Sequence, residues 1–596
     1  MNVPLNWLAE YVKLPKETKV LTDKLTAVGH MLDKVKTVGQ ETVIDLELRG
    51  NRADMFGLIG IAREVAATTD TNLKIPEIPP LPKIDKNCPL VNVQPGAADL
   101  VTRYTAVKLT VKVGPSPKWL VDRLTAYGLP SVNNVVDVTN YVMVETSHPL
   151  HAFDFDLIKG GQLILRRAKK GEKFATVQQG TTLILSDQDL AIADQNSVHC
   201  LSIIGGLDSR VTDQTSHIIL ESAVYNPANC RRTARRLKTI TEGGTRHEKH
   251  QDPNGVSLSL ARSIDLLKRI ASAKIASLTS DYYPHPVKPR IIKFDPHEIA
   301  RLTGLRVPVS TINKILSGLE FIIHGQDVTV PTFRTDIENQ ADIVEEVIRV
   351  YGYDHIPSTP ISDATPVPST YSSYAVGKKL RDELIKLGLN EAITLTMVEN
   401  GQIKLVNPPD PALSYLRTDI APSLVKYAHR LLNLRQRRVA LFEVGKTFSR
   451  KRNNYQEHSH LGIAVSDNLT GILQKLAQLL GVDQLPVQIG EVESVYWAEV
   501  DVDKLQASLP PFVNPYSVVS IFPPIIEDIN VPYTGNYAAI IAKIKKISSL
   551  INQIELIDKF ENKLTLRLTY HSPKTQLSSI DISPIREKLS KVMSLS

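Results

Sequence analysis

Apolar and polar side chains alternate along the chain with two periods, one typical of strands and one typical of helices. Residues 43–49 (VIDLELR) alternate apolar and charged positions, which predicts a half-buried strand. The run that follows, MFGLIGIAREVAATT, predicts a helix with Asp54 as its N-cap. An amphipathic helix is expected between Ser116 and Gly128. Because both patterns recur throughout, the predicted fold class is multidomain α+β.

Two proline-containing stretches interrupt the pattern and predict linkers, at residues 72–98 and 361–373. The patterns around them predict five domains. These are an N-terminal α/β unit (1–80), a mixed α+β domain (90–285), a winged-helix-like module (286–360), a module of alternating strands and helices (366–508) and a C-terminal ferredoxin-like domain (513–596).

The order helix, helix, hairpin within residues 286–360 is that of a winged helix-turn-helix. Such folds often bind DNA, yet residues 294–357 hold five Lys and Arg against ten Asp and Glu. A surface that binds phosphates needs the opposite balance. Direct DNA readout by this module is therefore disfavoured.

Composition narrows the class of protein. Of the 596 residues, 42% are hydrophobic and 22% are charged, as in ordinary globular proteins. No apolar run is long enough for a transmembrane helix, and no signal peptide is expected. Three widely spaced cysteines argue against a disulfide framework, so we expect a cytoplasmic protein without a membrane partner. The net charge of +7 is compatible with a polyanionic partner without proving one.

Four acidic residues in the winged-helix-like module are candidate metal ligands. Asp342, Glu345 and Glu346 are spaced so that one helix face could gather their oxygens, and Asp336 comes from the preceding turn. Oxygen donors without Cys or His suit a hard cation such as Mg²⁺. An acidic helix start that complements the helix dipole explains the same pattern, and the spacing does not decide between the two.

Several sequence blocks resemble the bacterial-type phenylalanyl-tRNA synthetase β-subunit family. The family signature is similar to RTDIENQADIVEEVIRVYGYDHIP (334–357). Two further family blocks are similar to NNVVDVTNYVMVETSHPLHAFD (133–154) and LESAVYNPANCRRTARRL (220–237). Others follow in family order, among them VPLNWLAEYV, LVNPPDPALSYLRTDIAPSLV, VALFEVGKTF and LTLRLTYHSPKTQL. The resemblance covers nearly the whole chain.

The resemblance implies a subunit of an α₂β₂ complex whose α subunit uses ATP to attach Phe to tRNA(Phe). This chain would bind tRNA(Phe), and its 90–285 domain would be an editing domain that hydrolyses mischarged Tyr-tRNA(Phe). The 366–508 module would be an inactive, class II synthetase-like antiparallel-sheet module in contact with α, and the 513–596 domain would bind the anticodon stem. The family also implies a Mg²⁺ site with four ligands: Asp336, Asp342, Glu345 and Glu346.

The resemblance also implies roles for single residues. Glu221 would meet the tyrosine hydroxyl, and His151 would position the tRNA 3′ end or the attacking water. A surface glutamate and a structural histidine are the ordinary alternatives. The other implied pocket residues are Thr139, Asn140, Gly205, Gly206 and Gly243. The candidate tRNA contacts, for which a solvated helix face is the alternative, are Arg231 and Arg235 with Arg232 and Arg236, and Lys543 and Lys546 with Lys545.

Two departures from the family pattern bear on function. Where the family usually reads TEASxRFExGVDP, this chain reads TEGGTRHEKHQDP (241–253), which places Gly243 and Gly244 for an alanine and a serine, and His247 for a phenylalanine. Residues 35–40 also run straight into the VIDLEL strand, without the OB-fold insertion of the family, which predicts weaker tRNA binding. A non-editing scaffold subunit of the same complex is therefore the alternative, and a free-standing hydrolase of mischarged tRNA is a third hypothesis.

Overall fold

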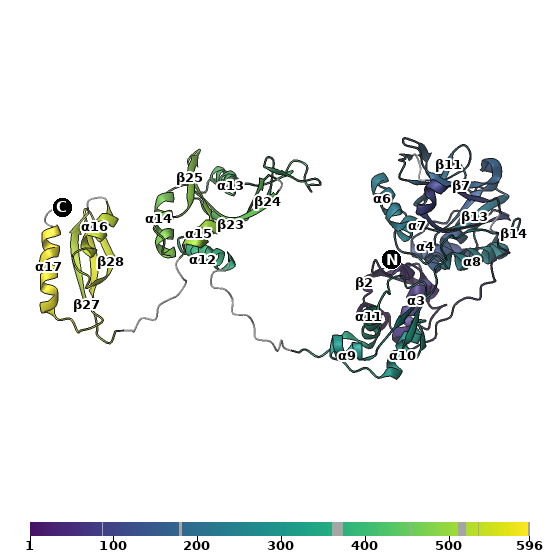
Figure 1. Cartoon of the computed structure of the whole chain (residues 1–596), viewed down its shortest axis with the longest axis horizontal. Coiled ribbons are helices and arrows are strands. Elements are labelled where there is room, and N and C mark those ends of the chain that lie inside the picture. The colour runs from purple at the N-terminus through teal and green to yellow at the C-terminus, as the bar shows by residue number, and fades with distance from the viewer. Residues whose placement is uncertain are drawn as a thin grey trace. The chain divides into compact units, whose positions relative to one another are not determined.

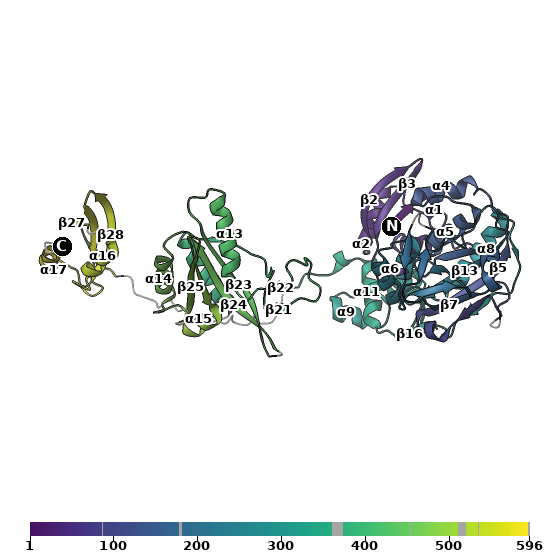
Figure 2. The same ribbon diagram turned by 90° about the horizontal axis from the view of Figure 1, so that it is seen from above.

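The computed structural model describes residues 1–85, 88–177, 181–359, 373–452, 454–509, 520–533 and 536–593. The chain divides into two compact units, residues 1–361 and 362–596 (Figures 1 and 2). Strands and helices are mixed in both units, so the predicted α+β class is confirmed. Within the described ranges, no helix is both long and apolar enough to cross a membrane.

The first unit begins with a small antiparallel sheet. Its elements are β1 (Asn2–Pro4), α1 (Leu5–Leu8), α2 (Thr18–Ala27), β2 (Met31–Val38), β3 (Glu41–Glu47) and α3 (Leu58–Thr69). The strand order is β1-β3-β2, seen in purple in Figure 2. The alternating pattern of VIDLELR falls on β3, where Val43, Ile44 and Leu46 are buried. Only residues 39–40 join β2 to β3, so this hairpin carries no inserted domain.

The helix after β3 begins later than the sequence predicts. Residues Ala53–Phe56 form a 3₁₀ turn, η1, and α3 begins at Leu58 with Gly57 at its N-cap. Asp54 is therefore not the cap, and its carboxylate accepts two hydrogen bonds from Arg52. A Cβ at Gly57 would lie 2.5 Å from the backbone nitrogen of Ser147, so only glycine fits this close approach.

The described part of the central domain of the first unit, residues 91–282, holds two five-stranded sheets, a two-stranded sheet of β8 (Lys173–Ala175) and β9 (Thr182–Ile184), and five α-helices. Its strands include β4 (Val91–Val93), β5 (Val101–Thr110), β6 (Leu150–Asp154), β7 (Leu163–Arg167), β10 (Leu190–Ala193), β11 (Val198–Leu201), β12 (Ile204–Gly205), β13 (His217–Tyr225), β14 (Lys274–Ile275) and β15 (Ser280–Tyr282). One sheet has the order β14-β5-β13-β6, with β15 also on β5, and the other has the order β12-β11-β10-β7-β4. The helices are α4 (Lys118–Tyr127), α5 (Asn134–Thr146), α6 (Pro227–Leu237), α7 (Glu242–His247) and α8 (Gly255–Ile270).

Helix α4 confirms one sequence prediction and shifts another. It ends at Gly128, whose φ of 109° is the left-handed conformation that glycine adopts readily. It begins at Lys118 rather than at Ser116, because the Ser116 hydroxyl donates to Asp137 at 2.5 Å and is held outside the helix.

Residues 290–351, the segment predicted to be a winged-helix-like module, complete the first unit. The elements of this segment are β16 (Arg290–Lys293), α9 (His297–Thr303), α10 (Val309–Gly318), β17 (Ile322–His324), β18 (Asp327–Val330) and α11 (Gln340–Tyr351), with the strand order β16-β18-β17. Apolar residues of all these elements share one core. Helix α11 extends this core toward α3 (Figure 1).

The second unit holds two further folds. The first comprises α12 (Ser373–Lys386), β19 (Asn390–Glu391), α13 (Ala421–Asn433), β23 (Ala440–Lys451), β24 (Asn454–Val465), α14 (Leu469–Leu480), β25 (Val487–Val492), β26 (Val495–Asp501) and α15 (Val502–Ser508). Its sheet has the order β19-β23-β24-β26-β25 and is antiparallel except for β19. The second comprises β27 (Ile525–Pro532), α16 (Tyr537–Lys545), β28 (Ile551–Phe560), β29 (Lys563–Tyr570) and α17 (Ser579–Met593), with the strand order β27-β29-β28.

Candidate functional site

A cavity of about 280 Å³ in the central domain brings together most of the pocket residues that the sequence predicts. Its walls come from β6, β13, α5, α7 and the turn between β11 and β12. The predicted residues that line it are Asn140, His151, Gly205, Glu221 and Gly243. The two others, Thr139 and Gly206, do not line it.

Glu221 is directed into this cavity by the alternation of β13. Ile219, Ala223 and Tyr225 share its face of the strand and pack in one core, whereas Leu220 faces the other core. Glu221 is 5% exposed, and its Oε2 has no hydrogen-bond partner in the described part of the chain. Burial raises the pKa of Glu221 well above its ordinary value, because the apolar surroundings disfavour the charged carboxylate.

His151 stands directly opposite Glu221 on the neighbouring strand. The antiparallel register of β6 and β13 pairs the two residues, so their side chains share one face of the sheet. Burial lowers the pKa of His151 to about 4, which keeps the imidazole neutral, and Nε2 is buried without a partner among the described residues. The cavity thus holds two polar side chains whose burial disfavours their charged forms. Each has a buried atom without a hydrogen-bond partner among the described residues.

The two glycines of the β12 turn have different roles. A Cβ at Gly205 would lie 2.5 Å from Cε1 of His151, so the absence of a side chain is what leaves room for the imidazole. A Cβ at Gly206 would lie 2.4 Å from the carbonyl oxygen of His199, which is a backbone packing constraint outside the cavity. Thr139 is likewise structural, because its hydroxyl donates to the Val136 carbonyl at 2.7 Å within α5.

Helix α7 forms the wall where the sequence departs from the family pattern. Thr241 caps the helix by accepting from the nitrogen of Gly244 at 2.9 Å, and its hydroxyl donates to the Ile203 carbonyl at 2.6 Å. A Cβ at Gly243 would meet Pro149 Cβ at 3.6 Å, which is an ordinary contact, so an alanine would fit there. The imidazole of His247 is 7% exposed, lines the cavity, and lies edge-on to a tyrosine ring.

Two cavity residues were missed or undervalued by sequence reasoning. Tyr225, whose ring centroid lies 4.8 Å from that of His247, was not identified as a site residue. Its position two and four residues from Ala223 and Glu221 on one strand could have revealed it. His247 was identified only as a departure from the family, although burial lowers its pKa to about 3 and leaves it neutral in the pocket wall.

The predicted basic contacts lie on exposed helix surfaces. Arg231, Arg232 and Arg235 are exposed on α6, which packs against α7, whereas Arg236 forms an ion pair with Asp189. In the second unit, the exposed candidates are Lys543 and Lys545 on α16 and Lys546 at its C-cap.

The four predicted metal ligands are not brought together. Asp336 accepts from Arg334 at 2.8 and 2.9 Å, and Glu346 is bound by Arg334 and Arg349. Asp342 caps α11 by accepting hydrogen bonds from two backbone nitrogens. Glu345 is exposed on the same helix. No group of three or more His, Cys, Asp or Glu among the described residues could hold a metal ion. In the chain by itself these oxygens do not meet on one helix face, because arginines bind two of them and backbone nitrogens a third, and their role as metal ligands stays a prediction.

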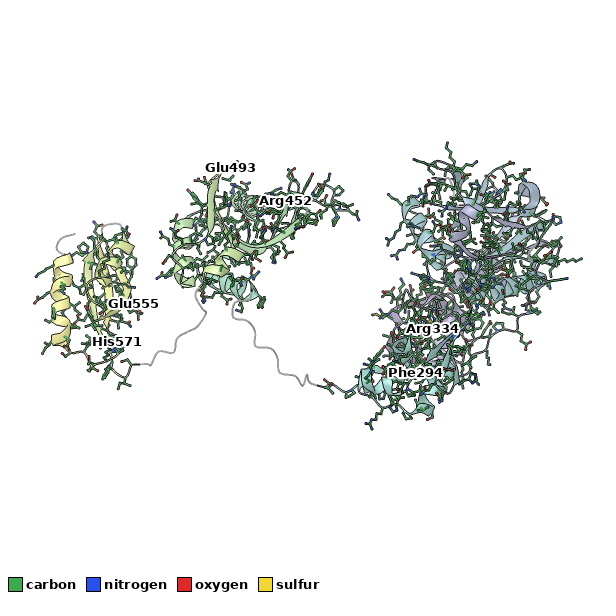
Figure 3. All side chains as sticks on the ribbon, in the orientation of Figure 1. Phe294, Arg334, Arg452, Glu493, Glu555 and His571 are labelled. Carbon is green, nitrogen blue, oxygen red and sulfur yellow. The ribbon has the colours of Figure 1, made fainter. Side chains whose placement is uncertain are left out.

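The carboxylates belong instead to a buried network that joins α3 and η1 to α11. Arg349 bridges Glu64 and Glu346, and Arg334 extends the network to Asp336 (Arg334 is labelled in Figure 3). The buried members of the network are four arginines and four carboxylates: Arg52, Arg63, Arg334, Arg349, Asp54, Glu64, Asp336 and Glu346. None of these side chains is more than 10% exposed. At the edge of the network, Arg63 also pairs with the partly exposed Glu320 at 2.6 Å.

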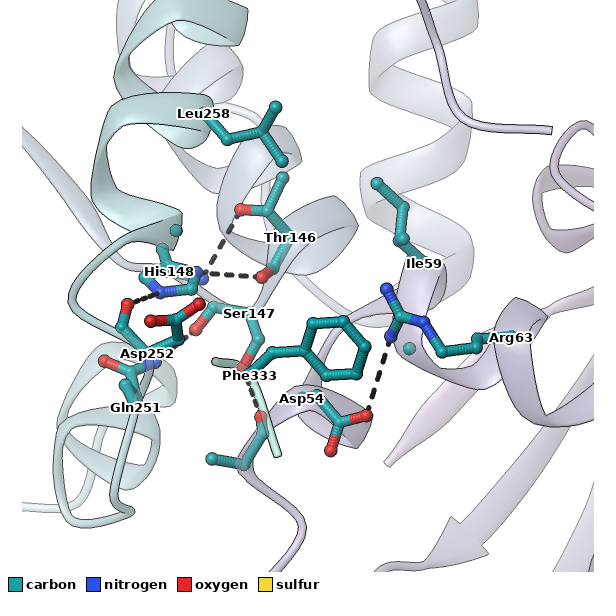
Figure 4. Close-up of a pocket in the computed structure, with 13 residues that line it drawn as sticks. Asp54, Ile59, Arg63, Thr146, Ser147, His148, Gln251, Asp252, Leu258 and Phe333 are labelled. Carbon is teal, nitrogen blue, oxygen red and sulfur yellow. Dashed lines mark hydrogen bonds and ion pairs between the residues drawn. The ribbon is translucent and has the colours of Figure 1, made fainter. Parts of the chain in front are cut away.

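A second cavity, of about 130 Å³, lies beside this network where three parts of the first unit meet. Figure 4 shows Arg63 and Asp54 on one side of it and His148 on the other. The guanidinium carbon of Arg63 lies 3.8 Å from the ring centroid of Phe333, from the winged-helix-like module. The Ser147 hydroxyl donates to the Ala53 carbonyl at 2.7 Å, which ties the central domain to η1.

Comparison with known proteins defines the class of protein to which this arrangement belongs. Residues 101–272, which hold the first cavity, match the model of the B3/4 domain. Residues 292–353 match the tRNA synthetase B5 domain, and residues 356–495 match the phenylalanyl tRNA synthetase beta chain CLM domain. These domains define a tRNA synthetase chain.

Individual proteins that match most of the chain identify its family. The β subunit of phenylalanine–tRNA ligase from Rhodopirellula baltica is 33% identical, over 81% of this chain and 74% of its own. The β subunit from Geobacter metallireducens is 36% identical, over 69% of this chain and 54% of its own. The chain therefore belongs to the phenylalanine–tRNA ligase β-subunit family, and it spans about half the length of several curated relatives it matches. A solved N-terminal fragment of the β subunit from Pyrococcus horikoshii is 18% identical with a TM-score of 0.36, over 59% of this chain and 99% of the fragment.

Proposed function

We propose that this chain is the β subunit of a phenylalanine–tRNA ligase, in which it binds tRNA(Phe) and hydrolyses tRNA(Phe) mischarged with tyrosine. The observation that carries the editing role is the pair Glu221 and His151 on adjacent strands of one cavity. Both side chains are buried, and each has an atom without a hydrogen-bond partner in the described part of the chain. The family membership supports the remaining parts of the proposal.

A second site is needed because a pocket built for a phenyl ring rejects an added hydroxyl poorly, by about 100-fold. Glu221 inverts this preference. A tyrosyl hydroxyl gives the buried carboxyl a hydrogen-bond partner, whereas a phenyl ring leaves it unpaired. We therefore expect Glu221 to be a donor as well as the acceptor that the sequence predicts.

Hydrolysis needs a water molecule held next to the ester that joins tyrosine to the tRNA 3′ end. The water oxygen forms a bond to the carbonyl carbon, and the ribose oxygen leaves with a proton. The neutral imidazole of His151 can accept a hydrogen bond from that water, because its lowered pKa leaves a nitrogen lone pair free at neutral pH. Gly205 gives His151 the room to do so.

Exposed apolar residues in the second unit support the proposal that a partner subunit binds there. Ile393 and Leu395 are 93% and 63% exposed and line a groove of about 1100 Å³ together with Tyr427 of α13. Apolar side chains exposed in this way are typical of a surface that another chain covers. We propose that the α subunit occupies this groove in an α₂β₂ complex, and that ATP and Mg²⁺ serve the synthetic site of α. We also propose that Arg231, Arg235, Lys543 and Lys546 contact tRNA(Phe).

A non-editing scaffold subunit is the second candidate function. The altered wall of the cavity favours it, because Gly243 removes a side chain and His247 places a polar ring in the pocket. In that case the chain would still bind α and tRNA(Phe) but would not hydrolyse Tyr-tRNA(Phe).

Deacylation of Tyr-tRNA(Phe) by the co-purified α and β chains separates the two. Rapid hydrolysis that Glu221→Ala and His151→Ala abolish would support editing at this cavity. Glu221→Gln is the matched control: because burial disfavours the charged carboxylate, the neutral amide should keep most of the discrimination between Tyr and Phe. A complex that charges tRNA(Phe) with Phe but deacylates nothing above buffer would support the scaffold function. A β chain that stays monomeric beside α in a size measurement would contradict both.

A further inference from the structure

We propose that α6 and the exposed residue after it, Ile240, form the surface over which a single-stranded RNA 3′ terminus reaches the cavity. Phosphates of the RNA would contact the arginines of α6, and the last nucleotide would pack on Ile240. This inference rests on the proposed function and deepens it, because it names the route of the substrate to the site.

The exposed face of α6 carries positive charge without local compensation. Cys230 and Ala234 are buried against the domain core, so the opposite face of the helix is turned to solvent. Arg231 and Arg235 lie on that face one turn apart, about 6 Å along the helix axis. Together with Arg232, they have no ion-pair partner in the described part of the chain.

The neighbouring Arg236, in contrast, has its charge compensated by a carboxylate. Arg236 forms an ion pair with Asp189, and Asp189 also accepts from Thr233 at 2.9 Å. A helix C-terminus favours cations through its dipole, which could account for the charge alone. It does not account for the apolar residue that follows.

Ile240 is 86% exposed although the chain on both sides of it is anchored. On one side, Thr239 is buried and its nitrogen donates to the Ala234 carbonyl at 3.0 Å. On the other side, Thr241 lines the cavity and caps α7. The isoleucine is thus held in water at the border between the basic helix and the pocket. Covering it with the flat face of a base or ribose would remove apolar surface from water.

Three substrates of decreasing size test this surface in the α–β complex. They are Tyr-tRNA(Phe), 3′-O-tyrosyl adenosine and tyrosine methyl ester. Ile240→Ser should raise KM about tenfold for the first two, which carry the terminal nucleotide and cover the apolar side chain, and leave the ester unchanged, with kcat unchanged throughout. Arg231→Ala with Arg235→Ala should raise KM for Tyr-tRNA(Phe) alone. The same double variant should lower the salt dependence of tRNA binding by about one unit of slope for each phosphate that is no longer bound.

Matched controls come from elsewhere in the first unit. Ile291→Ser replaces an isoleucine that is 64% exposed on β16, and Arg301→Ala removes an exposed arginine that is paired with Glu298. Neither should change any of the three reactions. An Ile240→Ser variant that impairs hydrolysis of the methyl ester equally, or that resembles Ile291→Ser, would overturn the proposal.

The two proposals fail in different ways. If the complex deacylates none of the substrates, editing fails. The docking surface is then judged by direct tRNA binding, where an unchanged salt slope in the double arginine variant would overturn it. If deacylation proceeds but no variant of this surface changes KM for Tyr-tRNA(Phe), the docking surface fails and editing stands.

Discussion

Replacing Arg349 with methionine should destabilise the first unit strongly. Arg349 donates four hydrogen bonds, two to Glu64 and two to Glu346, at 2.5 to 2.9 Å, and its side chain is 6% exposed. Its removal leaves two buried carboxylates with one arginine each, Arg52 and Arg334, and gives the network a net negative charge. Breaking a buried ion pair by removing one partner costs about 3–5 kcal/mol.

The assay is urea unfolding followed by tryptophan fluorescence. The chain has three tryptophans, and Trp497→Phe removes the one in the second unit, so that Trp7 and Trp119 report on the first unit alone. In this background Arg349→Met should lower the free energy of unfolding by about 3–5 kcal/mol. Adding Glu64→Gln should recover part of the loss, because one uncompensated charge is removed.

Arg301→Met is the matched control, since Arg301 forms an exposed pair with Glu298. It should leave the unfolding midpoint unchanged. An Arg349→Met variant no less stable than this control would refute the reasoning. Because every buried carboxylate of the network is paired with an arginine, a chelator should also leave the unfolding curve of the isolated chain unchanged. A large shift on chelation would show that a metal contributes after all.

Three further predictions concern the cavity and acid stability. Gly205→Ala should abolish Tyr-tRNA(Phe) deacylation, because the new Cβ would displace His151, and activity within twofold of wild type would contradict this geometry. Gly243→Ala should preserve the fold, with an unchanged unfolding midpoint, because its Cβ meets only an ordinary contact at 3.6 Å. Burial lowers the pKa of His30 to about 4 from 6.5, so below pH 6.5 the unfolded state binds a proton that the folded state does not. Stability should therefore fall by about 3 kcal/mol between about pH 6.5 and pH 4, and His30→Asn should remove that loss in the same urea assay.

Local sequence patterns predicted an element well where its position depends only on its own residues. The alternation of VIDLELR located β3, because its apolar residues face a core and its charged residues do not. Gly128 located the end of α4, because a left-handed residue is a local requirement. The start of α3 was misplaced, because the carboxylate of Asp54 accepts two hydrogen bonds from Arg52 and pairs with Arg63 instead of capping the helix.

Only part of the candidate site could be predicted from the sequence, because its residues meet through nonlocal contacts. Glu221 and His151 came from the family resemblance, and the register of β6 and β13 explains why two residues 70 positions apart in sequence meet. The carboxylates of α11 show where sequence reasoning stops. Their spacing is right for a shared ligand, but Arg334 and Arg349 bind two of them, and no local pattern shows which way a buried guanidinium turns.

The contacts between the parts of the first unit have a consequence for how the chain can be cut. Ser147 binds the Ala53 carbonyl, and Asp252 accepts from Thr332 at 2.7 Å, so the central domain is bonded to the segments before and after it. In a fragment limited to residues 90–285, the backbone of Ser147, on which Gly57 packs, would be exposed. The part of the second cavity that lies in the central domain would be exposed as well. The smallest piece of this chain that should fold by itself is therefore the whole stretch from the first strand through α11, and proteases should find few productive cuts inside it.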